Sequence, residues 1–253
     1  MISVAGVELE MLERGQGAPI FYLHGGGGIG LDLPFLDLLA KAHRVIAPSH
    51  PGFGQSSLPD WLDSMDDIAH IYLELMDRLG LTRTDLVGFS IGGWIAAELA
   101  TKVPERINRV VLIGPVGVKT GPPDKLDIPD VFAMPREKLD RLRFHDPAKN
   151  PADLASMPDE ALHTVARNSE TLALLTWEPY MHNPKLKHRL HRVKVPALFL
   201  RGASDGIVSA EYLERYAALL PQARIETVAE AGHLPHVEQP NTTAAKVLKF
   251  LNT

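Results

Sequence analysis

A serine flanked by small residues is the first candidate for chemistry in this chain. Residues 88–92 read GFSIG, a G-x-S-x-G pattern that follows the apolar run 84–88 and precedes the helical pattern 91–102. A tight turn from strand to helix projects a serine hydroxyl above the sheet edge, at the positive end of the helix. The bare pattern also fits a glycine-rich turn with a capping serine. Its place between a strand and a helix favours Ser90 as a nucleophile.

A serine hydroxyl is a weak nucleophile and needs a neighbouring base. His233 follows Ala231-Gly232 after the strand pattern 225–228, so we expect it on a loop at the carboxyl end of a strand. An imidazole there can accept the serine proton and return it near neutral pH. His236 is the competing base, but His233 lies closer to the strand and directly after a glycine. We therefore predict that His233 is the base.

The base in turn needs an acid that fixes its tautomer and stabilises the imidazolium ion. Asp205 follows the apolar run 197–200, again at the carboxyl end of an expected strand. The dipeptide Asp205-Gly206 also fits an ordinary turn, in which the aspartate caps the next helix. The chain order Ser90, Asp205, His233 on successive strand ends nevertheless favours a catalytic triad, because the three signals agree.

Strand and helix patterns alternate along most of the chain and would position these residues. Two short strands are expected at the N-terminus, around Ala5-Gly6. Further strands are expected at 20–23, 44–47, 84–88, 110–113, 197–201 and 225–228, and helices at 31–41, 66–79, 91–102, 210–220 and 242–251. Such alternation produces right-handed crossovers and a mostly parallel sheet with helices on both faces. From about 114 to 194 the sequence is proline-rich and irregular, which we interpret as a helical cap.

The composition is that of an ordinary globular protein. The chain has 253 residues, of which 45% are apolar and 23% charged, with a net charge of −5 and no cysteine. The negative charge argues against nucleic acid and anionic membrane surfaces as partners. The missing cysteines exclude disulfides, thiolate metal sites and a cysteine nucleophile. Without a signal peptide, a spanning apolar run or a His pair at metal spacing, we expect a cytoplasmic protein with no metal and no cofactor. The expected partner is a small-molecule substrate, and the sequence leaves open whether the chain forms a homodimer.

Several motifs resemble those of the α/β-hydrolase fold superfamily. They are His24-Gly25-Gly26-Gly27, the turn HPGFGQS at 50–56, GFSIGG at 88–93, GASD at 202–205, and Gly232-His233-Leu234-Pro235 with Glu238-Gln239-Pro240. One departure is His50, where many members carry an acidic residue in a turn that is usually structural. The resemblance implies an α/β-hydrolase fold with a mostly parallel eight-stranded sheet flanked by helices. It also implies a core domain of residues 1–114 and 193–253, with a helical cap at 115–192 inserted after the sixth strand.

The glycine-rich segment 24–30, HGGGGIG, also contains G-x-G-x-x-G, the pattern of a dinucleotide-binding turn. Such a site needs an acidic residue about 20 positions on, at the end of the next strand. That strand ends at 46–50 with IAPSH, which holds no carboxylate. The resemblance instead implies an oxyanion hole, and it makes His24 a structural, hydrogen-bonded histidine. The expected donors are the backbone N–H groups of Gly26 and Ile91, with Gly27 as the alternative.

The triad and the resemblance together imply a cofactor-free serine hydrolase. Its substrate would be a small, largely apolar carboxylic ester, lactone or related carbonyl compound, cleaved through an acyl-enzyme. Ser90 argues against epoxide opening and halide displacement, because the related enzymes for those reactions use an aspartate nucleophile. The alternatives are a hydrolase that cleaves the C–C bond of a vinylogous diketone, and a lyase or perhydrolase with the same triad. A non-catalytic small-molecule receptor is disfavoured, because all three triad residues are present.

Substrate choice is expected to depend on the cap. Its apolar side chains could roof an apolar pocket or pack the cap onto the core. They are Phe132, Met134, Leu172, Leu174, Leu175, Trp177, Tyr180 and Met181. We choose Trp177 as the residue that forms a pocket wall.

Overall fold

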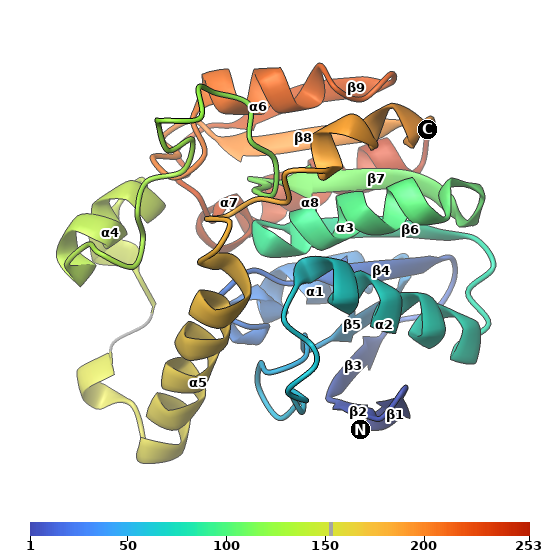
Figure 1. Cartoon of the computed structure of the whole chain (residues 1–253), viewed down its shortest axis with the longest axis horizontal. Coiled ribbons are helices and arrows are strands. Elements are labelled where there is room, and N and C mark those ends of the chain that lie inside the picture. Colours follow the sequence, from blue (N-terminus) through green and yellow to red (C-terminus); the bar gives the residue numbers. More distant parts are fainter. Residues whose placement is uncertain (152–153) are drawn as a thin grey trace.

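The computed structural model describes residues 1–151 and 154–253, and a seven-stranded sheet forms its centre (Figure 1). In spatial order the strands are β3 (Met11–Arg14), β5 (Arg44–Pro48), β4 (Pro19–Leu23), β6 (Thr84–Phe89), β7 (Ile107–Ile113), β8 (Ala197–Gly202) and β9 (Ala223–Val228). β3 pairs antiparallel with β5, and the other neighbouring strands are parallel. The expected α/β fold with a mostly parallel sheet is confirmed.

The two short strands expected around Ala5-Gly6 are present, but they lie outside the main sheet. β1 (Ile2–Val4) and β2 (Val7–Leu9) form a two-stranded sheet of their own, around a turn in which Ala5 and Gly6 have φ of 49° and 82°. The chain then changes sheets at Glu10, so that β3 alone joins the main sheet. Among the described residues the sheet therefore has seven strands, and the expected eight-stranded sheet is wrong. The alternation of apolar side chains is continuous through this region, so it could not reveal where the pairing partner changes.

Helices cover both faces of the sheet (Figure 1). One face packs against α2 (Met65–Arg78), α3 (Ile91–Lys102) and α6 (Ala210–Ala217), and the other against α1 (Leu33–Leu39) and α8 (Pro240–Leu251). Alternate side chains of β4 divide between the two cores: Phe21 belongs to the first, and Ile20 and Tyr22 belong to the second. This period of two along each strand is what a sheet buried on both faces requires.

The segment between β7 and β8 forms the region expected to be a cap. It contains α4 (Arg136–Arg143), α5 (Asp159–Thr176) and short 3₁₀ turns, and Figure 1 shows α4 and α5 to the left of the sheet, beyond the strand ends. The two connections to the sheet lie side by side, because the N–H of Asn183 donates to the carbonyl of Gly117 at 3.0 Å. The segment leaves after β7, the strand expected at 110–113, which is the fifth strand of the main sheet in chain order rather than the sixth because β1 and β2 pair apart. The domain boundaries at 114/115 and 192/193 stay a prediction.

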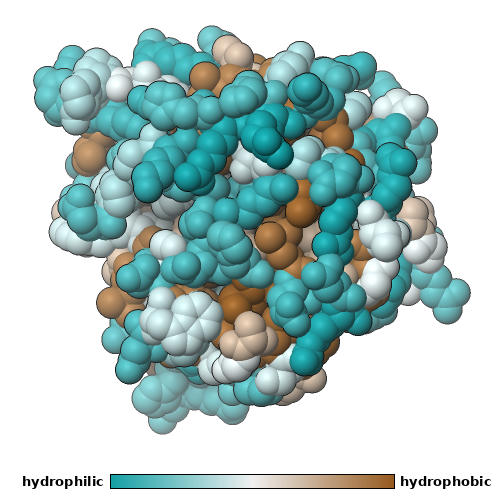
Figure 2. All heavy atoms as spheres, turned by 45° about the vertical axis from the view of Figure 1, so that its right-hand side comes forward, coloured by the Kyte–Doolittle hydropathy of each residue, from teal (hydrophilic) through white to brown (hydrophobic). Residues whose placement is uncertain are grey.

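The face of the molecule drawn in Figure 2 is mainly polar. In the view of Figure 2, polar side chains cover most of the face, and apolar side chains are visible in the gaps between them. Scattered apolar exposure of this kind is normal for a globular protein. Within the described ranges, no helix has both the length and the apolar character needed to cross a membrane.

Candidate active site

Ser90 lies on the turn between β6 and α3, where the sequence predicts it. Its φ of 54° lies in the left-handed region, which costs a non-glycine residue about 1–3 kcal/mol. The Ser90 N–H donates to the carbonyl of Ile113 at 2.9 Å, and the Ser90 carbonyl accepts the N–H of Trp94 at 3.2 Å. The motif glycines are needed because a Cβ on Gly88 would overlap the backbone of Gly92. The turn is therefore fixed by its neighbours, and Ser90 stays partly exposed.

His233 contacts both Ser90 and Asp205. Its Nε2 lies 3.2 Å from Oγ of Ser90, and its Nδ1 lies 3.0 Å from Oδ2 of Asp205. An ionised carboxylate can only accept a hydrogen bond, so Nδ1 carries the ring proton and Nε2 is free to accept the serine proton. The arrangement can therefore take a proton from Ser90 while its oxygen attacks an electrophilic carbon.

Asp205 is held so that one oxygen faces the imidazole. Its Oδ1 accepts the backbone N–H groups of Ile207 and Val208 at 2.9 and 2.8 Å, which leaves Oδ2 for His233. The carboxylate is completely buried. Gly114 at the end of β7 makes room for the pair, because a Cβ there would lie 3.1 Å from Nδ1 of His233. Burial and hydrogen bonding thus fix the orientation of the acid.

His236, the competing base, pairs with a different carboxylate. Its Nε2 lies 2.9 Å from Oδ1 of Asp32, whose other oxygen accepts the hydroxyl of Tyr22 at 2.7 Å. The His236 ring packs against Phe89, with the ring centroids 4.3 Å apart. Among the described residues His236 makes no hydrogen bond to Ser90. His233 is the histidine that the structure brings to the serine.

The glycine-rich loop after β4 lies beside Ser90. A Cβ on Gly25 would lie 3.5 Å from the Cβ of Ser90. The N–H of Gly28 donates to the carbonyl of Gly25 at 3.1 Å and closes the loop into a turn. In the part of the chain that the structure describes, the N–H of Gly26 has no hydrogen-bond acceptor. The oxyanion roles of Gly26, Gly27 and Ile91 stay predictions.

Helix α5, in the segment between β7 and β8, packs over this loop. The side chain of Asn168 donates from Nδ2 to the carbonyl of Gly27 at 3.1 Å and accepts the N–H of Gly54 on Oδ1 at 3.0 Å. Leu172, one turn further along α5, covers Gly26, where a Cβ would lie 2.7 Å from a leucine methyl. Leu172 belongs to the predicted apolar set, whereas sequence reasoning missed Asn168. A single asparagine within a helical sequence pattern does not indicate a functional role, because its contacts become known only from the structure.

Trp177, the predicted pocket-wall residue, lies at the end of α5 and is largely exposed. It forms the C-cap of α5, its side chain is 55% exposed, and its ring packs against Phe132 with centroids 5.7 Å apart. Leu175 and Met181 from the same apolar set are buried in the main core. Leu172 is the cap residue that the structure places against the glycine-rich loop. A contact between Trp177 and substrate stays a prediction.

Glu238 connects the loop of His233 to the cap, a role that the sequence motif did not reveal. Its Oε2 accepts the N–H of Gly232 at 2.6 Å, and its Oε1 accepts the N–H of His145 at 2.8 Å. His145 follows α4, so one carboxylate joins the base loop to the segment beyond that helix. The glutamate is visible in the motif Glu238-Gln239-Pro240, but its hydrogen-bond partners are backbone N–H groups, which the sequence does not identify.

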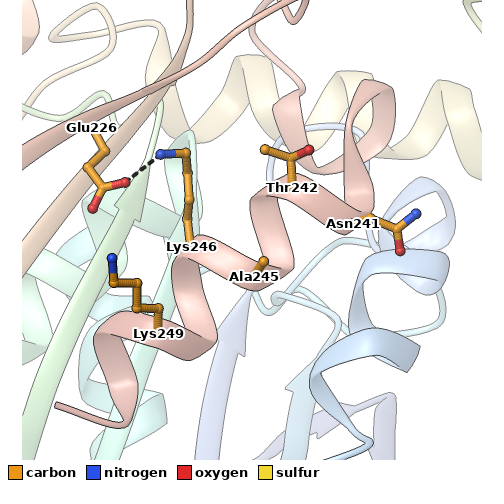
Figure 3. Close-up of a pocket in the computed structure, with 6 residues that line it drawn as sticks. All are labelled: Glu226, Asn241, Thr242, Ala245, Lys246 and Lys249. Atoms are coloured by element: carbon orange, nitrogen blue, oxygen red, sulfur yellow. Dashed lines mark hydrogen bonds and ion pairs between the residues drawn. The ribbon is translucent and has the colours of Figure 1, made fainter.

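A surface hollow of about 490 Å³ lies apart from this site (Figure 3). Its lining comes from β9 and α8: Glu226, Asn241, Thr242, Ala245, Lys246 and Lys249. An ion pair of 2.6 Å between Lys246 and Glu226 crosses one side of it. Its lining is mostly polar side chains, and it includes no residue of the predicted triad. Across residues 1–151 and 154–253, no group of three His, Asp or Glu side chains gathers as a metal site.

Comparison with known proteins assigns the chain to a family. The model of the alpha/beta hydrolase family matches residues 20–246, which include the serine turn, the glycine-rich loop and the loops of Asp205 and His233. The chain belongs to the alpha/beta hydrolase family. The expected fold and the expected enzyme class of this α/β-hydrolase are thereby confirmed.

Individual relatives cover nearly the whole α/β-hydrolase chain. The dihydrolipoyllysine-residue acetyltransferase component of the acetoin cleaving system from Cupriavidus necator is 31% identical over 98% of this chain and 67% of its own length. The 2-hydroxymuconate semialdehyde hydrolase of Pseudomonas sp. is 28% identical over 99% of this chain and 92% of its own. Among solved structures, a membrane phospholipase A described as a bacterial virulence factor superposes with a TM-score of 0.81. It is 27% identical and covers 99% of this chain and 84% of its own.

Proposed function

We propose that this α/β-hydrolase cleaves a small, largely apolar carboxylic ester, lactone or related carbonyl compound, with Ser90, His233 and Asp205 as its catalytic triad. The observation that carries the proposal is the continuous series of contacts from Oγ of Ser90 through the His233 ring to Asp205, at 3.2 and 3.0 Å. These distances are within the range in which a base can take a proton from a nucleophile.

In the first step, Oγ of Ser90 attacks the carbonyl carbon while its proton moves to Nε2 of His233. The imidazolium ion that forms is stabilised by Asp205, which stays ionised. The former carbonyl oxygen becomes an oxyanion, for which Gly26 and Ile91 would supply backbone N–H donors. Donors fixed in place before the reaction stabilise this charge without reorganising, an effect worth about 10²–10³ in kcat for each donor.

The second half of the reaction releases both products. The imidazolium of His233 protonates the leaving alcohol as the tetrahedral intermediate collapses to an acyl-enzyme on Ser90. A water molecule then gives its proton to the same imidazole and attacks the acyl carbon. The carboxylic acid leaves, and Ser90 recovers its proton from His233. Every proton is returned, so this reaction needs no cofactor.

The substrate is proposed to be largely apolar because of the cap. Leu172 covers Gly26 on the glycine-rich loop, next to the predicted oxyanion site. We further propose that residues 115–192 act as the cap of a core formed by 1–114 and 193–253. A substrate whose carbonyl oxygen binds at Gly26 would lie close to Leu172, and an apolar acyl group suits that contact.

Cleavage of a C–C bond beside a ketone is the second candidate. The observation that favours it is the 28% identity to 2-hydroxymuconate semialdehyde hydrolase over 99% of this chain. Both reactions place an oxyanion and a general base in the same region, so the geometry of the triad alone does not separate them. A panel that compares p-nitrophenyl esters with vinylogous diketones would do so through the ratio of their kcat/KM values.

The central experiment is labelling with a fluorophosphonate probe, followed by mapping of the modified peptide. We expect one adduct on Ser90 in the wild-type protein and none in Ser90→Ala, together with hydrolysis of p-nitrophenyl butyrate that Ser90→Ala abolishes. A wild-type protein that hydrolyses esters without an adduct at Ser90 would assign the nucleophile elsewhere. A wild-type protein with neither property would support the receptor alternative.

A further inference from the structure

Two stacked histidines lie beneath the glycine-rich loop and are not used in the proposed reaction. The rings of His24 and His50 are parallel within 28°, with centroids 3.7 Å apart, and both residues are completely inaccessible to solvent. His50 occupies the position where many α/β-hydrolases carry an acidic residue. A buried pair of imidazoles must have every nitrogen accounted for, since an unpaired buried polar atom is costly.

The hydrogen bonds determine the tautomer of His24. Its Nε2 accepts the backbone N–H of His50 at 2.8 Å, so this nitrogen carries no proton. Its Nδ1 lies 2.7 Å from the carbonyl of Gly25, which can only accept, so Nδ1 carries the proton and donates it. A doubly protonated ring would direct an N–H group at the N–H of His50. Burial also lowers the pKa of His24 and keeps the ring neutral.

His50 is fixed by the same reasoning. Its Nε2 lies 2.9 Å from the carbonyl of His24 and must donate to it. Its Nδ1 is therefore unprotonated and accepts the hydroxyl of Tyr72 at 2.6 Å. Burial and the neighbouring His24 lower the pKa of His50 well below its usual value. Each ring thus has one arrangement of protons: Tyr72 and the His24 carbonyl fix the ring of His50, and the backbone N–H of His50 and the carbonyl of Gly25 fix the ring of His24.

That carbonyl controls the direction of the N–H of Gly26. The carbonyl of Gly25 and the N–H of Gly26 belong to one planar trans peptide unit and point in opposite directions. The carbonyl is held twice, by Nδ1 of His24 at 2.7 Å and by the N–H of Gly28 at 3.1 Å. Rotation of this peptide would break both hydrogen bonds. A glycine-rich loop is otherwise free to rotate its peptides, because glycine populates both signs of φ.

We propose that His24, held in its Nδ1–H tautomer by His50, is a positioning residue that aims the N–H of Gly26 at the oxyanion. The inference rests on the proposed function, since it assigns a purpose to the predicted donor Gly26. His24 touches no reacting atom and acts only through the Gly25–Gly26 peptide. Its effect should therefore appear in the stabilisation of the transition state and much less in the binding of substrate.

Two variants of His24 separate this role from simple packing. In His24→Asn, the amide nitrogen occupies the position of Nδ1 and can still donate to Gly25. In His24→Gln, the amide oxygen occupies the position of Nε2 and can still accept from His50, but the donor to Gly25 is lost. Both variants remove the stacked ring, and each keeps one of the two hydrogen bonds of His24: His24→Asn keeps the donor to Gly25, and His24→Gln keeps the acceptor for His50.

With p-nitrophenyl butyrate we expect His24→Gln to lower kcat by about 10²-fold, the effect of losing one oxyanion donor, while KM changes by less than about threefold. His24→Asn should stay within about tenfold of wild type, because it keeps the donor to Gly25. Affinity for butylboronic acid, which forms a tetrahedral adduct with an active serine, should fall in His24→Gln by the same factor as kcat/KM. Equal losses in the two variants, or losses that follow their thermal unfolding midpoints, would overturn the positioning role.

Two further measurements keep the outcomes distinct. If neither variant folds, ¹⁵N NMR of the wild-type imidazoles decides: His24 should have a protonated Nδ1 and an unprotonated Nε2, and the opposite tautomer overturns the proposal. Fluorophosphonate labelling of the wild-type protein tests the proposed function separately. Labelling of Ser90 with equal losses in the two variants removes only the role of His24. Absence of both labelling and ester hydrolysis removes the proposed function, and the role of His24 with it.

Discussion

The backbone N–H of His233 donates to the backbone carbonyl of Arg143 over 2.6 Å, so the last residue of α4 holds the loop of the base. The preceding carbonyl, that of Leu142, accepts the N–H of Gly206 at 2.9 Å, directly after Asp205. The last carbonyls of a helix have no partner within the helix, so they are available for such bonds. The C-terminal end of α4 therefore fixes the loops of both the proposed base and the proposed acid.

Glu238→Ala should lower both stability and activity, because Glu238 completes this connection. The N–H groups of Gly232 and His145 would lose their acceptor, at a cost of about 1–3 kcal/mol in the free energy of unfolding. Loosening of the His233 loop should lower kcat by roughly tenfold or more, since small displacements of a catalytic group are costly. Urea unfolding and p-nitrophenyl butyrate kinetics measure the two effects.

The matched control is Glu226→Ala. Glu226 is a half-exposed glutamate whose ion pair with Lys246 lies at the surface, and such pairs contribute at most about 1 kcal/mol. We expect this variant to keep wild-type kinetics. A Glu238→Ala protein with unchanged kcat would show that the hydrogen bond from His233 to Arg143 suffices to hold the loop.

Much of this site could be predicted from the sequence, because local patterns determined it. The G-x-S-x-G turn requires small residues at 88 and 92 for steric reasons, and that requirement is visible as glycine. Asp205 and His233 each follow a recognisable apolar strand, and parallel strands bring their carboxyl ends to one edge. The placement of these three residues in contact therefore follows from element order alone.

Other features depend on packing that no local pattern encodes. The change of sheet at Glu10 interrupts an unbroken apolar alternation, so the strand count could not be read correctly. Trp177 is an aromatic residue of the kind that lines pockets, but it lies at the end of α5 and its side chain is largely exposed. Asn168 contacts backbone groups more than 100 residues away in the chain. Only the docked position of the cap reveals these relationships.

Asp205→Asn should lower kcat by about 10⁴-fold while the protein stays folded. An asparagine would still accept the N–H groups of Ile207 and Val208, but its amide nitrogen would face Nδ1 of His233 and favour the wrong tautomer. Kinetics with p-nitrophenyl butyrate, normalised to circular dichroism, measure the loss. Asp127→Asn serves as the control, because Asp127 also accepts backbone N–H groups, in the turn at 120–127. A loss below tenfold in Asp205→Asn would move the acid to another residue.

Gly114→Ala should separate backbone strain from crowding of the imidazole. Gly114 has φ of 48°, and a Cβ there would lie 3.1 Å from His233 and 3.4 Å from Asp205. Gly80→Ala is the matched control: its φ is 63°, and a Cβ there meets no atom within 4 Å. Both variants should lose about 1–2 kcal/mol of unfolding free energy through the left-handed backbone.

Only Gly114→Ala should also lose activity, by about tenfold or more in kcat, because the imidazole and carboxylate must move apart to admit the methyl group. The comparison is made at temperatures well below both unfolding midpoints, with kcat for p-nitrophenyl butyrate as the readout. If the two alanine variants keep equal kcat, the His233 ring has room that the distances do not indicate.

Asp85 should make stability depend on pH in a direction opposite to that of most carboxylates. It is buried at the start of β6, and burial raises its pKa to about 6, against the smaller opposing effects of Arg109 and His43. Between the ordinary aspartate pKa and about 6, the folded chain binds this proton more tightly than the unfolded chain does. The contribution to stability is therefore present at low pH and is lost as the pH rises through about 6.

Asp85→Asn removes this titration, so the unfolding free energy of the variant minus that of the wild type should rise between pH 4 and pH 7.5. The expected rise is roughly 1–3 kcal/mol, the equivalent of a shift of one to two pKa units. Urea unfolding of both proteins at the two pH values measures it, and the difference cancels the contributions of all other groups that titrate equally in both. The exposed carboxylate of Asp60 gives the control, since Asp60→Asn should show no such rise. A difference that stays constant for Asp85→Asn would mean that Arg109 and His43 keep the buried carboxylate ionised throughout this range.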